Sequence, residues 1–146
     1  MPTAKQQLDE FYLPLLVMQE RGKRVFRMFL TLLGRSYVFM YNDTLPEREM
    51  NLWAFWAENA FLPMNDQMVD LILKAQERNL IVGQIPDSFH EFIHYQQRFA
   101  AAHERWVRDG GQYQHPGNFP DGFEQDVLDK IGQLALETGW LPKMLT

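Results

Sequence analysis

The sequence predicts an all-α protein, a mostly antiparallel bundle of four to five helices that forms one domain over residues 1–146. Long segments carry apolar side chains at the three- and four-residue spacing of a single helix face. Short turns join these segments, which is typical of antiparallel helices. In addition, 46% of the residues are hydrophobic and 23% are charged, which is the composition of a globular domain with its own core.

The first two expected helices are delimited by glycine and proline. One runs from about residue 5 to residue 33, and the next begins at Pro46, because proline at the first helical position followed by acidic residues is a typical helix start. Pro63 is expected to kink or end this second helix, since its ring removes a backbone donor. Between the two helices, SYVFMY (residues 36–41) would allow a short strand, but no second segment is evident to pair with it.

The remaining helices follow polar turns. Asn65 or Asp66 can cap a third helix, in which apolar side chains recur from Met68 onward at helical spacing. A fourth is expected from about residue 87 to residue 108, after the turn GQIPD. The last is expected from residue 124 to residue 137, after a loop rich in glycine and proline.

The fourth helix has the clearest apolar stripe. At about 100° per residue, one broad face of it collects Phe89, Phe92, Ile93, Gln96, Phe99, Ala100, His103, Trp106 and Val107. His90 and His94 lie on the opposite face, among arginines. We therefore expect His103 to be a buried, hydrogen-bonded core histidine and the other two to be at least partly exposed to solvent.

Residues His90, Glu91 and His94 match the H-E-x-x-H motif of zinc hydrolases. On a helix, this spacing places two imidazoles side by side to bind one zinc ion, and the glutamate can deprotonate the zinc-bound water. A third ligand would have to come from His115, Asp121, Glu124 or Asp126. Because nothing in the sequence places one of them beside the motif, no cofactor is expected, and a zinc-dependent hydrolase is kept as an alternative function.

Charge and cysteine content exclude several classes of protein. The chain has no cysteine, so disulfides and thiolate zinc ligands are excluded, and its net charge of −5 disfavours nucleic acid as a partner. No apolar run reaches the length of a transmembrane segment, and the first ten residues have no signal core, which predicts a cytoplasmic protein. Five of the fourteen basic residues lie within residues 21–35. This stretch could bind an acidic partner or an anionic membrane surface.

The favoured function is non-enzymatic, acting through contact with an unknown protein partner or through self-association into a homo-oligomer. The chain is rich in aromatic residues, at 14%, and has eight methionines; both kinds of side chain are enriched at interface cores. Trp53 and Trp56, with Phe55 and Phe61 nearby, are expected in the core or at a subunit interface, with an aromatic ligand cage as the alternative. No complete set of catalytic residues is evident.

A pattern of packing residues runs through the first two thirds of the chain. FYLPL (residues 11–15) is followed by W-x-x-W-x4-F-x-P-x-N-x-x-M, which here is Trp53, Trp56, Phe61, Pro63, Asn65 and Met68, and then by Pro86, His94 and Trp106. Over about residues 11–106 the chain resembles a group of small, all-helical bacterial proteins without an assigned function. The resemblance implies a helical fold and no particular activity; the pattern includes a histidine like His94 and none like His90.

Overall fold

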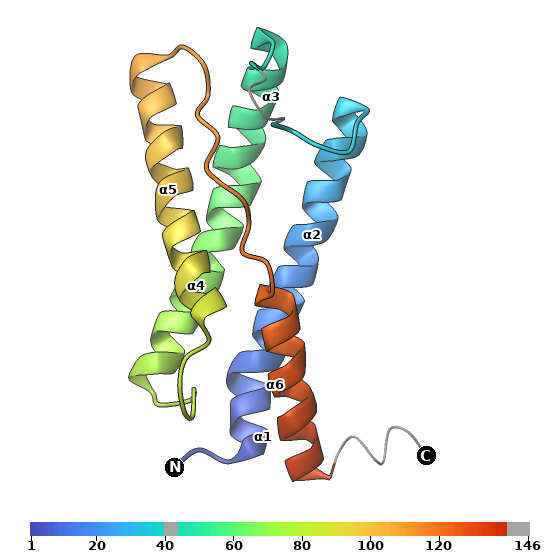
Figure 1. Cartoon of the computed structure of the whole chain (residues 1–146), viewed down its shortest axis with the longest axis vertical. Helices are drawn as coiled ribbons and strands as arrows, with labels where there is room; N and C mark the ends of the chain where they lie inside the picture. Colours follow the sequence, from blue (N-terminus) through green and yellow to red (C-terminus); the bar gives the residue numbers. More distant parts are fainter. Residues whose placement is uncertain (40–43, 140–146) are drawn as a thin grey trace.

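The computed structural model describes residues 1–39 and 44–139 (Figure 1). The described residues contain no strand, so the predicted all-α class is confirmed. Four helical rods stand side by side and run in alternating directions (Figure 1). Along the chain they are α1 (Ala4–Gln7), η1 (Leu8–Tyr12) and α2 (Leu13–Leu33); α3 (Glu47–Trp56), η2 (Ala57–Phe61) and α4 (Leu62–Glu77); α5 (Asp87–Asp109); and α6 (Phe123–Thr138).

Each of the first two rods contains a π-helical turn just before a proline. Segment η1 ends two residues before Pro14, and η2 ends two residues before Pro63. A proline inside an α-helix removes one hydrogen bond and its ring clashes with the preceding turn, and the wider π turn changes the hydrogen-bond register at that place. The bonds that close the two turns run from Leu13 N to Leu8 O and from Leu62 N to Ala57 O.

The interruption expected at Pro63 therefore takes the form of a π turn inside one continuous helical run, from Glu47 to Glu77. The expectation that Asn65 or Asp66 caps a separate helix is wrong, because both lie within α4. Of the strand considered for residues 36–41, residues 36–39 are not in a strand, and residues 40 and 41 lie outside the described part of the chain.

The fourth rod covers only one half of the bundle. Helix α6 packs against α1, η1, α2 and α5. The loop of residues 110–122 runs along the other half, from the end of α5 down to the start of α6 (Figure 1). Gln112 joins this loop to Leu45, two residues before α3, since its side chain accepts from Leu45 N at 3.0 Å and donates to Leu45 O at 3.2 Å.

Two groups of buried apolar side chains form the core. The α6 cluster, in the half that α6 covers, comprises Leu8, Phe11, Tyr12, Leu15, Met68, Ile72, Ala75, Leu80, Phe89, Phe92, Phe123, Val127, Ile131 and Leu134. The loop cluster, in the other half, comprises Phe29, Val38, Leu45, Trp53, Ala54, Ala57, Phe61, Phe99, Ala102 and Tyr113. Burial of these side chains is the main force that holds the rods together.

Most of the stripe predicted on α5 faces this core. Phe89, Phe92 and Phe99 are fully or almost fully buried. Val107 was expected on the same stripe but is 63% exposed. Helix α5 ends two residues later, so the last turn has little of the bundle left to pack against. Within residues 1–39 and 44–139, no helix is long and apolar enough to cross a membrane.

Candidate functional site

The H-E-x-x-H motif lies on the outer face of α5. His90, Glu91 and His94 are all exposed, as the periodicity of the helix predicted for the two histidines. A zinc site needs at least three protein ligands. The described part of the chain contains no group of three or more histidine, aspartate or glutamate side chains placed to hold a metal ion.

Three of the four residues considered as third ligands have other partners. His115 accepts the Gly117 backbone N–H on Nδ1 at 2.8 Å. The Asp126 carboxylate accepts from the Ser88 hydroxyl at 2.6 Å, and Glu124 forms an ion pair with a lysine described below. Asp121 lies in the loop before α6, at the edge of a cavity. The tertiary structure therefore adds no support for the zinc hydrolase as a function.

His103 is buried in the core, as predicted, with 8% of its surface exposed. Its Nδ1 lies 2.8 Å from the hydroxyl oxygen of Tyr113, which comes from the loop that follows α5. Burial raises the pKa of Tyr113, so this hydroxyl stays protonated and can donate to Nδ1. The hydrogen bond between His103 and Tyr113 holds the loop against α5, so the role of His103 is structural.

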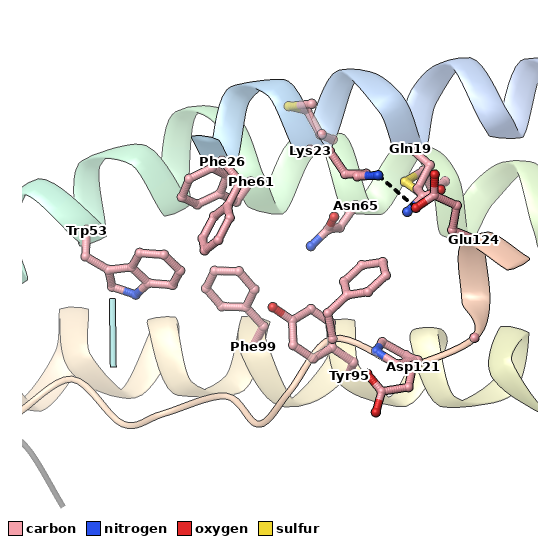
Figure 2. Close-up of a pocket in the computed structure, with 16 residues that line it drawn as sticks. Gln19, Lys23, Phe26, Trp53, Phe61, Asn65, Tyr95, Phe99, Asp121 and Glu124 are labelled. Atoms are coloured by element: carbon pink, nitrogen blue, oxygen red, sulfur yellow. Dashed lines mark hydrogen bonds and ion pairs between the residues drawn. The ribbon is translucent and has the colours of Figure 1, made fainter. Parts of the chain in front are cut away.

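A cavity of about 430 Å³ lies where the α6 cluster and the loop cluster meet (Figure 2). Its apolar wall carries rings from several elements: Trp53 from α3, Phe61 from η2 and Phe99 from α5. The Trp53 ring is stacked on the Phe99 ring, with centroids 5.4 Å apart and an interplanar angle of 11°. All three side chains are buried, so this is the closed end of the cavity.

Three uncharged polar side chains face the same space from three helices: Gln19 of α2, Asn65 of α4 and Tyr95 of α5 (Figure 2). Only 6% of the surface of Gln19 is exposed, and its buried Oε1 has no hydrogen-bond partner. Within the described residues, no hydrogen bond satisfies the side chain of Asn65 or of Tyr95 either. Burial raises the pKa of Tyr95 to about 12, so its hydroxyl is a neutral donor and acceptor.

An ion pair lies at the mouth of the cavity. Lys23 Nζ of α2 is 2.8 Å from Glu124 Oε2 of α6 and 3.9 Å from Glu20 Oε1 (Figure 2 shows the shorter contact). The hydrogen bond from Lys23 lowers the pKa of Glu124, and the same bond raises the pKa of Lys23. Both groups are therefore charged at neutral pH, and the positive charge of the lysine is already neutralised.

The outer face of α2 is a second surface of interest. Val17, Met28 and Leu32 are each more than half exposed along this face. Three exposed arginines lie among them, at positions 21, 24 and 27, and none forms an ion pair with another described residue. This face mixes apolar area with unpaired positive charge, which fits the basic stretch identified at residues 21–35.

The sequence did not identify the polar residues of the cavity. Asn65 was interpreted as a helix cap, whereas it lines the cavity from inside α4. Gln19 could have been found, because it lies on the apolar face of α2 with Leu15, Phe26 and Phe29. A glutamine in such a stripe must find a hydrogen-bond partner after folding.

Comparison with known proteins adds no further information: no family model, no curated protein and no solved structure matches the chain. The resemblance seen in residues 11–106 thus remains a prediction about the fold alone.

Proposed function

We propose that the protein is a binding protein that holds a small, largely apolar molecule in the cavity between α2, α4 and α5. One observation carries this proposal. Gln19, Asn65 and Tyr95, three uncharged polar side chains from three helices, line a cavity with an aromatic wall, and the buried Oε1 of Gln19 has no hydrogen-bond partner among the described residues. Ligand sites typically combine such an apolar lining with a few polar groups that fix the orientation of the ligand.

Energetics support the same conclusion. A buried polar atom left without a partner costs about 1–3 kcal/mol, so a position such as Gln19 would be more stable with an apolar residue if it only packed the core. A volume of about 430 Å³ also falls within the usual range of ligand pockets. A molecule that filled this space would restore both the missing contacts and the missing hydrogen bonds.

Gly22 provides a direct test, because it lines the cavity and lies in the middle of α2. A Cβ built on Gly22 meets only Met64 Cε, at 3.8 Å, which is an ordinary contact. We expect Gly22→Leu to fold, to fill the cavity and to abolish binding of naphthalene, measured by the change in intrinsic tryptophan fluorescence during a titration. The unchanged protein should show a saturable change.

Gly132 offers a matched control, since it is also a helical glycine but its Cβ would meet nothing within 4 Å. Gly132→Leu should bind naphthalene as the unchanged protein does. If the unchanged protein shows no saturable binding, or if Gly22→Leu binds as well as Gly132→Leu, the cavity is not the ligand site.

Contact with another protein is a second candidate function, favoured by the outer face of α2. There Val17, Met28 and Leu32 are exposed beside unpaired arginines. The partner that fits this chemistry is an acidic, amphipathic segment, which could belong to another protein or to a second copy of this acidic chain. Self-association would place the apolar residues of the face in an interface.

The charge-reversal variant Arg24→Glu and the variant Met28→Asp test this second candidate. Sedimentation equilibrium should show an oligomer that both substitutions convert to a monomer if the face joins two copies. If the protein is monomeric, binding to vesicles of anionic lipid that is lost in Arg24→Glu would identify a membrane surface in place of a protein. A monomer that binds neither vesicles nor acidic peptides would rule out this surface.

A further inference from the structure

Resting on the proposed function, we infer that the ligand of the cavity is an uncharged aromatic molecule with a hydrogen-bond donor and an acceptor on one edge, as in an aromatic carboxamide or a lactam. The aromatic part would lie against Trp53, Phe61 and Phe99, and the polar edge would face Gln19, Asn65 and Tyr95 (Figure 2).

The aromatic part follows from the shape and chemistry of the closed end. The Trp53 ring centroid lies 5.3 Å from that of Phe61 and 5.4 Å from that of Phe99. Rings that already pack against one another at such distances offer a further ring offset-stacked and edge-to-face contacts. Met64 and Met68 line the cavity beside them, and their thioether side chains adapt to irregular apolar surfaces.

The donor and acceptor on the ligand follow from the polar side chains. Buried Gln19 Oε1 accepts hydrogen bonds only, so the ligand must supply an N–H or O–H group to satisfy it. The Asn65 amide has both a carbonyl oxygen and an NH₂ group, and the Tyr95 hydroxyl can donate or accept. A carboxamide such as that of Asn65 can pair with a molecular edge that itself carries a donor and an acceptor, as Asn and Gln side chains do with the edge of adenine.

The absence of charge on the ligand follows from the ion pair at the mouth. Lys23 is the cationic side chain among those that line the cavity, and Glu124 Oε2 holds it at 2.8 Å. A carboxylate ligand would have to displace this partner. Of the acidic lining residues, Glu124 is in that pair and Asp121 is exposed to water. A buried ligand charge would therefore lack a free counter-charge beside Gln19, which makes its desolvation unfavourable.

Three probes that share one ring system separate the possibilities: naphthamide, naphthoate and methylnaphthalene. Isothermal titration calorimetry should show naphthamide binding at least about tenfold more tightly than either of the other two, because only the amide can satisfy the polar side chains without carrying a charge. Naphthoate and methylnaphthalene should still bind weakly through the ring.

Two variants with little change in shape identify the groups responsible. Gln19→Leu and Tyr95→Phe should each reduce naphthamide affinity by about three- to tenfold and leave methylnaphthalene affinity unchanged or improved. Gln97→Leu is the matched control, since Gln97 is exposed on α5 outside the cavity. This variant should bind all three probes as the unchanged protein does. Thermal unfolding of every variant verifies that it is folded.

The outcomes distinguish this inference from the proposed function. If methylnaphthalene binds as tightly as naphthamide, or naphthoate binds more tightly, the cavity is a ligand site but its ligand is not an uncharged amide-like molecule. Equal loss of naphthamide and methylnaphthalene in Gln19→Leu would also overturn the inference. If none of the three probes binds to the folded protein, both the inference and the proposed function fail.

Discussion

The α6 cluster and the loop cluster are built from similar residues, yet the loop cluster borders the cavity with the rings of Trp53, Phe61 and Phe99, whereas the α6 cluster borders it with Met68 alone. In the half that contains the α6 cluster, α6 packs against α1, η1, α2 and α5, and Phe11, Phe89 and Phe123 have no exposed surface. In the loop cluster an irregular segment, residues 110–122, takes the place of a fourth helix (Figure 1). It supplies a few large side chains, among them Tyr113.

The difference arises from how an element fills space. A helix presents side chains at every 1.5 Å of its length in a fixed cylinder, whereas an extended loop covers a greater length with fewer residues. Within the described residues, the backbone of α3 makes few close contacts with that of α2 or α5. Aromatic rings bridge the wider gap, as in the 5.7 Å contact between Phe29 and Trp53. The cavity lies where the half bridged by aromatic rings meets the half that contains the α6 cluster.

The largest effect is expected from truncating a ring in the α6 cluster. Phe89→Ala should lower the free energy of unfolding by about 3–5 kcal/mol, because Phe89 is fully buried and its removal leaves a void that the surrounding helices cannot fill. Phe26→Ala, at the rim of the cavity, should cost less than about 1.5 kcal/mol, since this ring is already 38% exposed. Urea denaturation measures both, and equal losses would show that the ring at the rim of the cavity is packed as closely as the ring inside the α6 cluster.

Alkaline pH tests the same comparison through the tyrosines. Burial raises the pKa of Tyr12, in the α6 cluster, and that of Tyr95, at the cavity, to about 12. Because both folded-state values lie above the ordinary 10.0, their burial stabilises the fold fully below pH 10, and this contribution is lost as the pH rises through 12. The part of the phenolate absorbance that comes from Tyr12 and Tyr95 and the loss of helical circular dichroism should therefore appear together in this window, and the helix should be lost at higher pH in Tyr12→Phe.

One result of these pH titrations would contradict the prediction. Ionisation of Tyr12 and Tyr95 near pH 10 with a native circular dichroism spectrum would show that water reaches both halves of the core equally.

A moderate effect is expected from His103, which fastens the loop to α5. His103→Ala should lower the free energy of unfolding by about 1–3 kcal/mol, because it removes the 2.8 Å hydrogen bond and leaves the Tyr113 hydroxyl without that partner. Thermal and urea unfolding measure the loss. In a double-mutant cycle with Tyr113→Phe, purely additive losses would indicate that the loop is not held by this bond.

The smallest effect concerns the exposed histidines of α5. His90→Ala should change the free energy of unfolding by no more than about 0.5 kcal/mol, since His90 lies on the solvent face. Metal analysis of protein purified without a histidine tag should give the same zinc content for both forms. Stoichiometric zinc that disappears in His90→Ala would instead restore the zinc hydrolase as a candidate function.

Sequence reasoning was most successful where a local property decides the structure. The all-α class and the ends of α5 follow from helical periodicity and from the turn before Asp87, and the burial of His103 follows from its place on the apolar stripe. It was less successful after Pro63, which was expected to kink or end the second helix and to be followed by a separate third helix capped by Asn65 or Asp66. Whether a proline ends a helix or is accommodated by a π turn depends on the packing of the whole rod, since tertiary contacts can hold the helix together across the lost hydrogen bond.

The sequence by itself thus determined the helices and which of their faces are buried, because side chains three and four residues apart share a face whatever the rest of the chain does. Only the tertiary structure decided that Gln19, Asn65 and Tyr95 meet at one cavity. Their meeting depends on how three rods are aligned along their axes and on a loop that occupies the place of a helix. Both are set by the packing of distant segments, and the spacing within any one segment does not contain that information.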